Sequence, residues 1–387
     1  MSRVKHTIVA KTMAGLEPVL KRELEAIGAE EAEAINRAVI FKGDNEVLYK
    51  ANYWPYTALR ILKIIDEFDV KDENDLYNKI KRIKWYKLMD LDGTLAIDTF
   101  LHNSTMTHSR FVSQKIKDAI VDQFRDMFER RPSVDTENPE LRINVHINKN
   151  HCTISLDSSG DSLHKRGYRQ ETNKAPINEV LAAGMLKLAG YDGNQNLLDP
   201  MCGSGTILIE AALMASNMPS AFYREEFGFF KWMDFEPLLW RQIKKEAFQF
   251  QKDPEGEIVG FDMNQNTITK AKANAKFAKL HHDIEFRQIE FSQSSKPFNE
   301  GLIVMNPPYG ERMKMQNMDE FYKMVGDTLK TEYKGFNAFI ISSDIEAIKH
   351  IGLKTSEKHI LYNGALECRF NKYELYEGSR KTVKEEE

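Results

Sequence analysis

Residues 302–310 read LIVMNPPYG, an apolar strand that runs directly into two consecutive prolines. Pro307 and Pro308 end the strand and hold a rigid loop at its carboxyl end. The exocyclic nitrogen of adenine or guanine is a poor nucleophile because its lone pair is delocalised into the ring, and two acceptors on its N–H bonds restore that lone pair. Asn306 offers its side-chain oxygen and Pro307 its backbone carbonyl, while Tyr309 offers a flat face for an unstacked base. The stretch predicts a catalytic loop for a base amine; the alternative is a strand-terminating turn around a buried tyrosine.

A glycine-rich turn stands upstream, where residues 199–206 read DPMCGSGT between a short apolar strand and an apolar helix. Gly203 and Gly205 let the backbone approach a ligand closely. The turn is not the dinucleotide fingerprint, because Leu208 stands where the third glycine belongs. On its own the pattern also fits a tight turn between a strand and a helix.

A carboxylate ends the next predicted strand, IVGFD at residues 258–262. At the carboxyl end of a strand beside the glycine-rich turn, Asp262 is placed to accept both hydroxyls of a ribose. The alternative is that Asp262 caps the helix predicted over residues 266–279. The two elements together favour the ribose role.

Two small α+β modules are predicted ahead of these motifs, the first about 65 residues long and the second ending near Ser159. In the second module, an apolar stripe predicts a helix over residues 110–131, and 141–147 with 152–156 predict a hairpin. Beyond it strands alternate with helices, which predicts a parallel sheet with crossover helices. The tail after residue 376 is predicted to be disordered.

Composition sets limits on partners and compartment. The 387 residues carry a net charge of −4, so nucleic-acid binding requires local basic patches. Three widely spaced cysteines and the absence of metal-ligand spacing argue against disulfides and metal sites and favour a reducing cytoplasm. No apolar run is long enough to span a membrane. We therefore expect a cytoplasmic protein with no metal and no membrane partner, and the oligomeric state stays open.

The motifs DPMCGSGT, IVGFD and IVMNPPYG, in this order, resemble the class I methyltransferase fold with the (N/D)PP(Y/F) signature of amino-methylases. The connector LHKRGYR at 163–169 and the segments APINE at 175–179 and LAA at 181–183 resemble RNA methylases that carry a THUMP domain. YNG at 362–364, LEC at 366–368 and GLE at 15–17 match the same branch. The chain is most similar to the RlmL-like 23S ribosomal RNA guanine-N2 methyltransferase family.

This resemblance implies an α/β fold with a C-terminal Rossmann-like methyltransferase sheet. It divides the chain into a ferredoxin-like segment at 1–65, a THUMP RNA-binding domain at 66–160, a methyltransferase domain at 161–376 and a tail at 377–387. The aromatic-rich stretch 216–252 is similar to an insertion of this branch.

The implied cofactor is S-adenosylmethionine. Its expected contacts are Asp199, Met201, Gly203, Gly205, Thr206, Asp262, Met263, Glu290 and Asn306. Glu290 departs from the family pattern, because an aspartate is usual where the adenine amine is held; a glutamate can accept the same bond from a slightly longer reach.

Structured RNA is the implied partner, with ribosomal RNA ahead of transfer RNA. Residues 79–87 place five basic side chains around Trp85 and Tyr86, which suits phosphate contacts with stacking but also fits a solvated helix face. The predicted RNA contacts are Tyr309, Lys165, Arg166, Arg169, Lys81 and Arg82.

Other functions stay open at this point. The Asn form of the signature occurs in guanine-N2 and in adenine-N6 enzymes, so adenine-N6 methylation of DNA or RNA and guanine-N2 methylation of transfer RNA are alternatives. A nicotinamide-dependent dehydrogenase is the rival enzyme class. An RNA-binding or assembly factor with a vestigial methylase domain is the non-enzymatic alternative.

Overall fold

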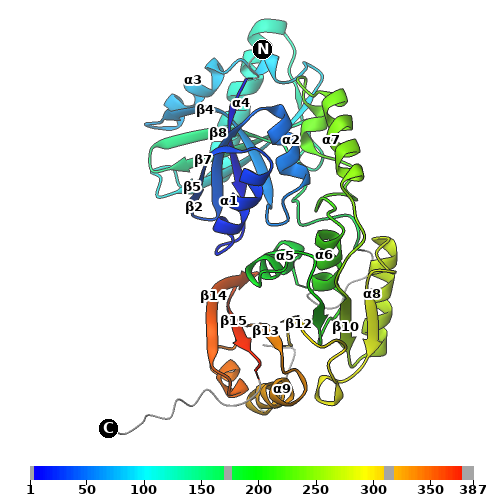
Figure 1. The fold of residues 1–387 in the computed structure, drawn as a ribbon. Coiled ribbons are helices and arrows are strands. Elements are labelled where there is room, and N and C mark those ends of the chain that lie inside the picture. Colours follow the sequence, from blue (N-terminus) through cyan, green and yellow to red (C-terminus); the bar gives the residue numbers. More distant parts are fainter. Residues whose placement is uncertain (1–3, 170–176, 309–317, 377–387) are drawn as a thin grey trace. The chain divides into compact units, whose positions relative to one another are not determined.

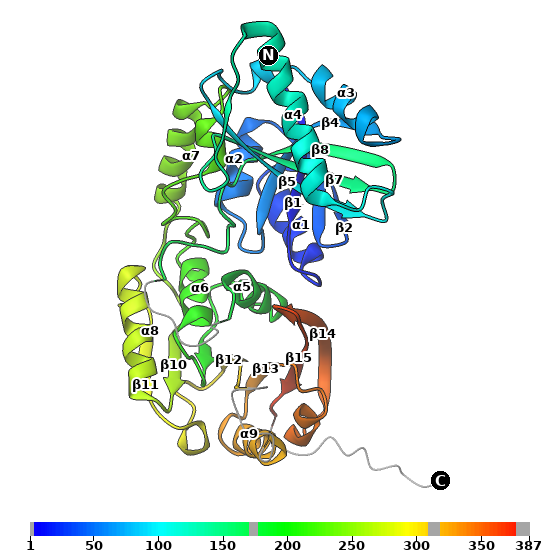
Figure 2. The same cartoon turned by 180° about the vertical axis from the view of Figure 1, so that it is seen from behind.

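Two β-sheets organise the computed structural model, which describes residues 4–169, 177–308 and 318–376 (Figures 1 and 2). Each sheet belongs to one compact unit. Unit 1 holds the chain up to residue 12 together with 20–167 and 221–249, and unit 2 holds 13–19, 168–220 and the chain from 250. Both units are therefore assembled from segments that are distant in the sequence.

The sheet of unit 1 has eight strands in the order β2-β3-β1-β4-β8-β7-β5-β6. The strands are β1 (His6–Lys11), β2 (Glu30–Ile35), β3 (Ala38–Gly43), β4 (Arg60–Asp69), β5 (Thr94–His102), β6 (Ser133–Val134), β7 (Leu141–Asn148) and β8 (His151–Asp157). Its helices are α1 (Glu17–Ala26), of which the first three residues belong to unit 2, α2 (Asn45–Tyr53), α3 (Glu73–Arg82), the short η1 (Trp85–Lys87) and α4 (Ser109–Phe128).

Antiparallel pairing of β4 with β8 joins the two predicted N-terminal modules into this one sheet. Each module alone would expose a strand edge whose N–H and C=O groups lack partners, and the shared pairing satisfies them. The hairpin β7–β8 is confirmed, with Lys149 in the left-handed region at its tip. The helix predicted over 110–131 ends earlier, at Phe128, because Glu129 turns into the left-handed region and its N–H caps Arg125 O.

The aromatic-rich insertion packs in unit 1. It contains η2 (Gly228–Lys231) and α7 (Pro237–Gln249). Phe229 stacks on Tyr49 of α2 with ring centroids 4.4 Å apart, and Trp240 lies edge-on to Tyr53. These rings are buried in the hydrophobic core of unit 1. The predicted methyltransferase segment 161–376 is thus not one compact body, since 161–167 and 221–249 cluster with the N-terminal sheet.

The sheet of unit 2 has seven strands in the order β11-β10-β9-β12-β13-β15-β14. They are β9 (Leu197–Asp199), β10 (Ile258–Asp262), β11 (Glu285–Gln288), β12 (Gly301–Met305), β13 (Phe336–Ser342), β14 (Thr355–Asn363) and β15 (Leu366–Glu374). The helices are α5 (Glu179–Leu188), α6 (Thr206–Ala215), α8 (Gln265–Phe277), α9 (Met318–Glu332) and the short η3 (Phe291–Gln293) and η6 (Ala347–Ile351).

The first five of these strands are parallel, and β15 inserts antiparallel between β13 and β14. Helices α5 and α6 lie on one side of the sheet and α9 on the other (Figures 1 and 2). Gly260 lets α6 approach β10 closely, because a Cβ there would lie 2.3 Å from Leu208 Cδ1. The predicted Rossmann-like α/β fold is confirmed.

Candidate active site at the carboxyl ends of the parallel strands

The strand order of unit 2 reverses at β9. From β9 the chain adds β10 and β11 on one side and β12 and β13 on the other. In an open parallel sheet, ligands bind in the crevice beyond the carboxyl ends of the strands at such a reversal. Asp199 ends β9, Asp262 ends β10 and Asn306 follows β12, so the three predicted motifs meet at this edge.

The glycine-rich turn between β9 and α6 leaves room for a ligand. Gly203 and Gly205 have φ angles of +55° and +85°, in the region that favours glycine. A Cβ on Gly203 would meet no atom within 4 Å, whereas one on Gly205 would lie 3.3 Å from Ala271 Cβ. Gly203 therefore faces open space and Gly205 faces the protein. The first N–H groups of α6 have no side-chain cap, which suits an anionic ligand group.

Asp262 ties this turn to β10. Its Oδ2 accepts a hydrogen bond from Gly203 N at 3.2 Å, and its Oδ1 accepts one from Asn264 N at 2.9 Å. The N-cap of α8 is Asn264, whose side chain accepts from Asn266 N and Thr267 N, so the capping alternative for Asp262 is wrong. Burial raises the pKa of the Asp262 carboxyl. The half-buried carboxylate retains lone pairs that can accept ribose hydroxyls.

Asp199 supports the turn from inside the protein. It is only 1% exposed, and its Oδ1 accepts a hydrogen bond from Met201 N at 3.1 Å. Burial raises the pKa of Asp199 to about 8. The structure gives this carboxyl a role in shaping the turn, and its contact with the cofactor stays a prediction.

Met263 and Glu290 extend the site along the edge of the sheet. Met263, next to Asp262, is 69% exposed, and a thioether at such a position can lie against the face of a purine. Glu290 is exposed just beyond β11 and accepts a hydrogen bond from Ser292 Oγ at 2.7 Å. Met201 is partly buried against the core of unit 2. Both Met263 and Glu290 are exposed, so a ligand at this edge of the sheet can reach them.

Asn306 presents a buried acceptor that no described residue satisfies. Its Oδ1 is among the buried side-chain atoms without a hydrogen-bond partner in the described part of the chain. Leaving such an acceptor unpaired costs about 1–3 kcal/mol, so a partner from a ligand would be favourable. Pro307, the next residue, is buried. Tyr309, the predicted stacking residue, lies outside the described residues.

The connector arginines do not face solvent as predicted for RNA contacts. Arg166 is 1% exposed, and its guanidinium donates to Leu163 O and Tyr56 O. An enclosed guanidinium cannot reach a phosphate, so the prediction for Arg166 is wrong. The Arg169 side chain is 17% exposed and bonds within unit 2. Its RNA contact stays a prediction that these bonds do not favour, whereas Lys165 is exposed.

The basic run at 79–87 is also less accessible than predicted. Trp85 is fully buried and donates to Ile80 O at 2.9 Å, so it serves the core and not base stacking. Lys81 pairs with Asp126 at 2.6 Å, which raises its pKa and neutralises its charge locally. Arg82 is exposed, and its RNA contact stays a prediction.

Sequence reasoning missed Asn274, which helps to fix the glycine-rich turn. This α8 residue is 2% exposed, and its Nδ2 donates to Ser204 O at 3.1 Å. The signal was available, because an asparagine interrupts the buried face that Ile268, Ala271 and Ala275 form on this helix.

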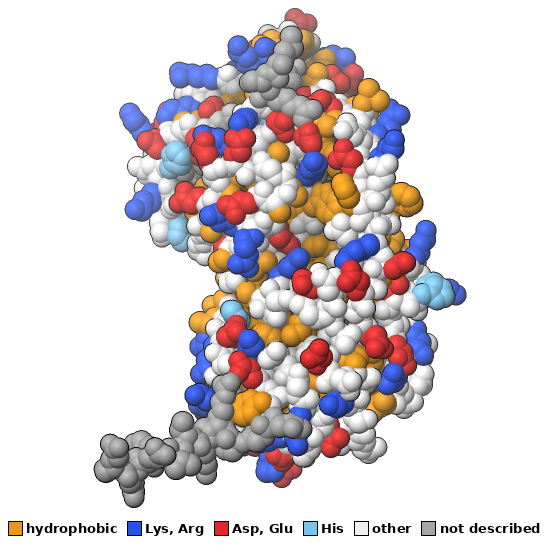
Figure 3. All heavy atoms as spheres, in the orientation of Figure 1, with side chains coloured by type: hydrophobic (Ala, Val, Ile, Leu, Met, Phe, Trp, Pro, Cys, Tyr) orange, Lys and Arg blue, Asp and Glu red, His pale blue; other side chains and the backbone are white. Residues whose placement is uncertain are grey.

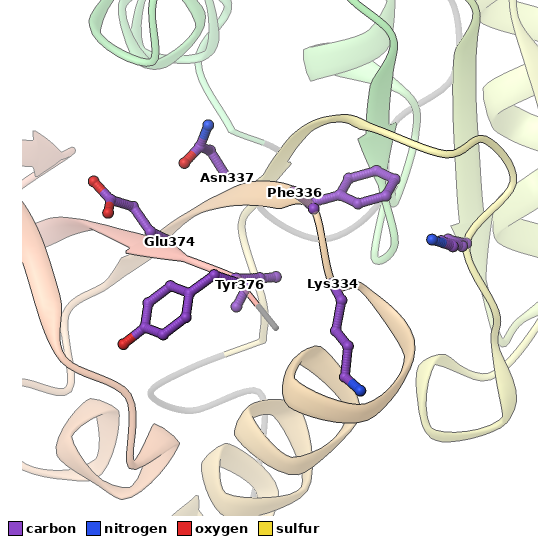
Figure 4. Close-up of a pocket in the computed structure, with 8 residues that line it drawn as sticks. Lys334, Phe336, Asn337, Glu374 and Tyr376 are labelled. Atoms are coloured by element: carbon purple, nitrogen blue, oxygen red, sulfur yellow. The ribbon is translucent and has the colours of Figure 1, made fainter. Parts of the chain in front are cut away.

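An open pocket of about 540 Å³ lies elsewhere in unit 2 (Figure 4). Its lining includes Lys334, Phe336 and Asn337 at the start of β13 and Glu374 and Tyr376 at the end of β15. The start of β13 is at the amino ends of the parallel strands, opposite Asn306. The pocket therefore does not belong to the candidate site.

Residues 4–169, 177–308 and 318–376 contain no cluster of His, Cys, Asp and Glu side chains arranged to hold a metal ion. Within the same ranges, no helix has the length and apolar character needed to cross a membrane.

Models of three known domains match consecutive parts of the chain. The RlmL ferredoxin-like domain matches residues 7–62, the THUMP domain 70–157 and the RMKL-like methyltransferase domain 166–372. The last match alone covers more than half of the 387 residues.

Similar proteins carry related names. A putative RNA methyltransferase of Synechocystis is 38% identical over 94% of this chain and 95% of its own length. The ribosomal RNA large subunit methyltransferase K/L of Syntrophotalea carbinolica is also 38% identical over 94% of this chain, which spans only 53% of that relative. The crystal structure of SMU.472, a putative methyltransferase complexed with SAH, aligns with 98% of this chain and 100% of its own, at 28% identity and a TM-score of 0.88.

Proposed function

Because this chain belongs to the RMKL-like methyltransferase family, we propose that it transfers a methyl group from S-adenosylmethionine to guanine N2 of large-subunit (23S) ribosomal RNA. The predicted class of enzyme and its cofactor are confirmed by the family match and by the neighbour solved with SAH. The nicotinamide-dependent dehydrogenase is thereby excluded. The RNA target, the residue roles and a cytoplasmic location are proposals for this chain.

The unpaired Asn306 Oδ1 is the observation that carries the proposed chemistry. It is a buried acceptor at the carboxyl end of β12, where the strand order places a ligand crevice. An acceptor there can take one N–H of a base amine, and the Pro307 carbonyl can take the other. Both bonds draw the N–H electrons toward nitrogen and restore its lone pair for attack.

The residues around the glycine-rich turn fit the cofactor. Gly203 faces open space, Asp262 offers acceptors for ribose hydroxyls, and Met263 and Glu290 are exposed where an adenine would extend. When bound, the cofactor supplies an electrophilic methyl carbon. The protein's contribution is to hold the amine in line with it and to exclude water, which accounts for most of the catalysis without a covalent enzyme–base adduct.

A surface of unit 1 formed by residues 99–117 is better suited to RNA docking than the basic run at residues 79–87. Residues 99–117, from the end of β5 into α4, contain no acidic residue. Arg110 and Phe111 are exposed there, and the exposed Lys149 lies beside His102 of the same stretch, since its N–H donates to His102 O at 2.9 Å. Basic and aromatic side chains together suit phosphate contacts and base stacking. Elsewhere, charges of both signs are interspersed on the visible face (Figure 3).

The choice of ribosomal RNA rests on the names of the K/L relatives. Guanine-N2 methylation of transfer RNA and adenine-N6 methylation of DNA or RNA remain the alternative outcomes, because the Asn306 loop can serve either base amine. An inactive RNA-binding factor is disfavoured by the intact Asn306-Pro307-Pro308-Tyr309 sequence.

When the protein is incubated with labelled S-adenosylmethionine and either unmodified large-subunit ribosomal RNA or duplex DNA, we expect label to enter the RNA and not the DNA. Exchanging Arg110 and Phe111 together for alanine should weaken RNA binding at least tenfold, about 1.4 kcal/mol, without changing SAH affinity. Lys21→Ala, which removes a charge from α1, is the matched control. Label in DNA alone, or full RNA affinity of the double variant, would count against the proposal.

Point variants are preferable to deletion of residues 1–160 in this experiment. Such a deletion would remove Tyr49 and Tyr53 from the buried rings of Phe229 and Trp240. The resulting exposure of apolar surface would confound loss of RNA binding with misfolding.

A further inference from the structure

The last residue of the connector described by the structure, Arg169, is held among three groups of unit 2. Its Nη2 lies 2.8 Å from Glu179 Oε1, 3.0 Å from Thr206 Oγ1 and 3.1 Å from Ile177 O. Glu179 begins α5, and Thr206 begins α6 directly after Gly203–Gly205. One guanidinium therefore links the connector, the start of α5 and the turn that receives the cofactor.

The side chains that hold the Arg169 guanidinium are buried. Glu179 and Thr206 are only 5% and 4% exposed. The guanidinium of Arg169 loses hydration in such surroundings, and the negative charge of Glu179 offsets that loss. Removing the charge of either residue would leave the other charge uncompensated. The pair thus fixes the guanidinium with its Nη2 within hydrogen-bond distance of the Thr206 hydroxyl.

The bond from Arg169 determines what the Thr206 hydroxyl can offer. A hydroxyl has one proton and two acceptor lone pairs. Because Oγ1 already accepts from Arg169, its own proton remains to be donated. Thr206 stands at the first turn of α6, whose backbone N–H groups have no side-chain cap, so a donated proton adds to an environment that favours a carboxylate.

We propose that Arg169 is a positioning residue for S-adenosylmethionine: it fixes the Thr206 hydroxyl as a donor to the carboxylate of the cofactor's methionine end. The inference rests on the proposed function for the identity of the ligand. It assigns to Arg169 a role in cofactor affinity and none in contact with RNA.

The neighbouring residue provides a control for mere stiffening of the connector. Tyr168 is 1% exposed, and its hydroxyl donates to Glu210 Oε1 at 2.8 Å in the interior of α6. Tyr168→Phe removes an equally buried connector bond to the same helix, but one made to Glu210, four residues beyond Thr206. Loss of this bond should lower thermal stability and leave the Thr206 hydroxyl in place.

The test is calorimetry with SAH on the full chain, together with steady-state kinetics. Arg169→Met should weaken SAH binding about tenfold and raise KM for S-adenosylmethionine by a similar factor, with kcat changed by less than about threefold. Thr206→Val should weaken SAH binding to a similar extent. The double variant should lose no more than either single one, because both act through one bond. Arg169→Lys, which keeps the charge beside Glu179, should recover part of the affinity.

Unchanged SAH affinity in Thr206→Val would overturn the inference even if Arg169→Met fails to fold. An equal loss in Tyr168→Phe would also overturn it, because general loosening of the connector would then explain the effect. If the unsubstituted protein binds no SAH, the proposed function fails and not only this role of Arg169.

Discussion

Asn306→Ala should lower the rate of methyl transfer by about 100- to 1000-fold, the loss measured when one preorganised polar group is removed from an active site. The reason is that Asn306 Oδ1 is a buried acceptor for which the described residues supply no hydrogen-bond donor. Removing it takes away the group that restores the lone pair of the base amine. Binding of SAH should stay within about twofold, since the amide acts on the acceptor nitrogen.

Single-turnover kinetics and SAH calorimetry on the same preparation would separate these two effects. Asn337→Ala is the matched control, because it makes the same change at the amino end of β13 beside the pocket of Figure 4. Asn306→Asp, which keeps an acceptor, should retain more activity than the alanine variant. Methyl transfer at the native rate in Asn306→Ala would remove this residue from the mechanism.

Asp262→Ala should lower the affinity for S-adenosylmethionine at least tenfold, about 1.4 kcal/mol. Two contributions add here. The carboxylate offers acceptors to the ribose hydroxyls, and its Oδ2 also accepts from Gly203 N, which fixes the backbone of the turn. The alanine variant loses both the ligand contact and the support of the turn.

Asp283→Ala provides the control for this loss, measured by the same calorimetry. Asp283 is half-buried, and burial raises its pKa as it does for Asp262, but it precedes β11 and so lies at the amino ends of the parallel strands. Its substitution should leave affinity unchanged. Equal affinities for the Asp262→Ala variant and the native protein would show that the ribose is held elsewhere.

Much of unit 2 could be predicted from the sequence because its signals are local. An apolar run that ends in glycines, an acidic residue or two prolines predicts both the strand and the residue at which it ends. The bounds that the sequence predicts for β10, Ile258–Asp262, are those observed. The parallel alternation then places all three strand ends at one edge. These steps need no knowledge of which distant residues meet.

The errors concern contacts between distant segments. The sequence from Phe227 to Trp240 is rich in apolar residues. Nothing in the neighbouring sequence shows that these residues pack against Tyr49 and Tyr53 of α2. The charges of the connector likewise look exposed when only the sequence is considered. Arg166 donates to the carbonyl of Tyr56, which is distant in the sequence, and Arg169 pairs with Glu179, which is near in the sequence but is brought to it only by the start of α5.

The most direct test of the proposed chemistry is the identity of the methylated nucleoside. Unmodified large-subunit ribosomal RNA would be incubated with the full-length chain and S-adenosylmethionine, digested, and analysed by nucleoside mass spectrometry, with Asn306→Ala run in parallel. We predict N2-methylguanosine as the product of the native protein and none above background from the variant. N6-methyladenosine as the only product, or N2-methylguanosine formed equally by Asn306→Ala, would contradict it.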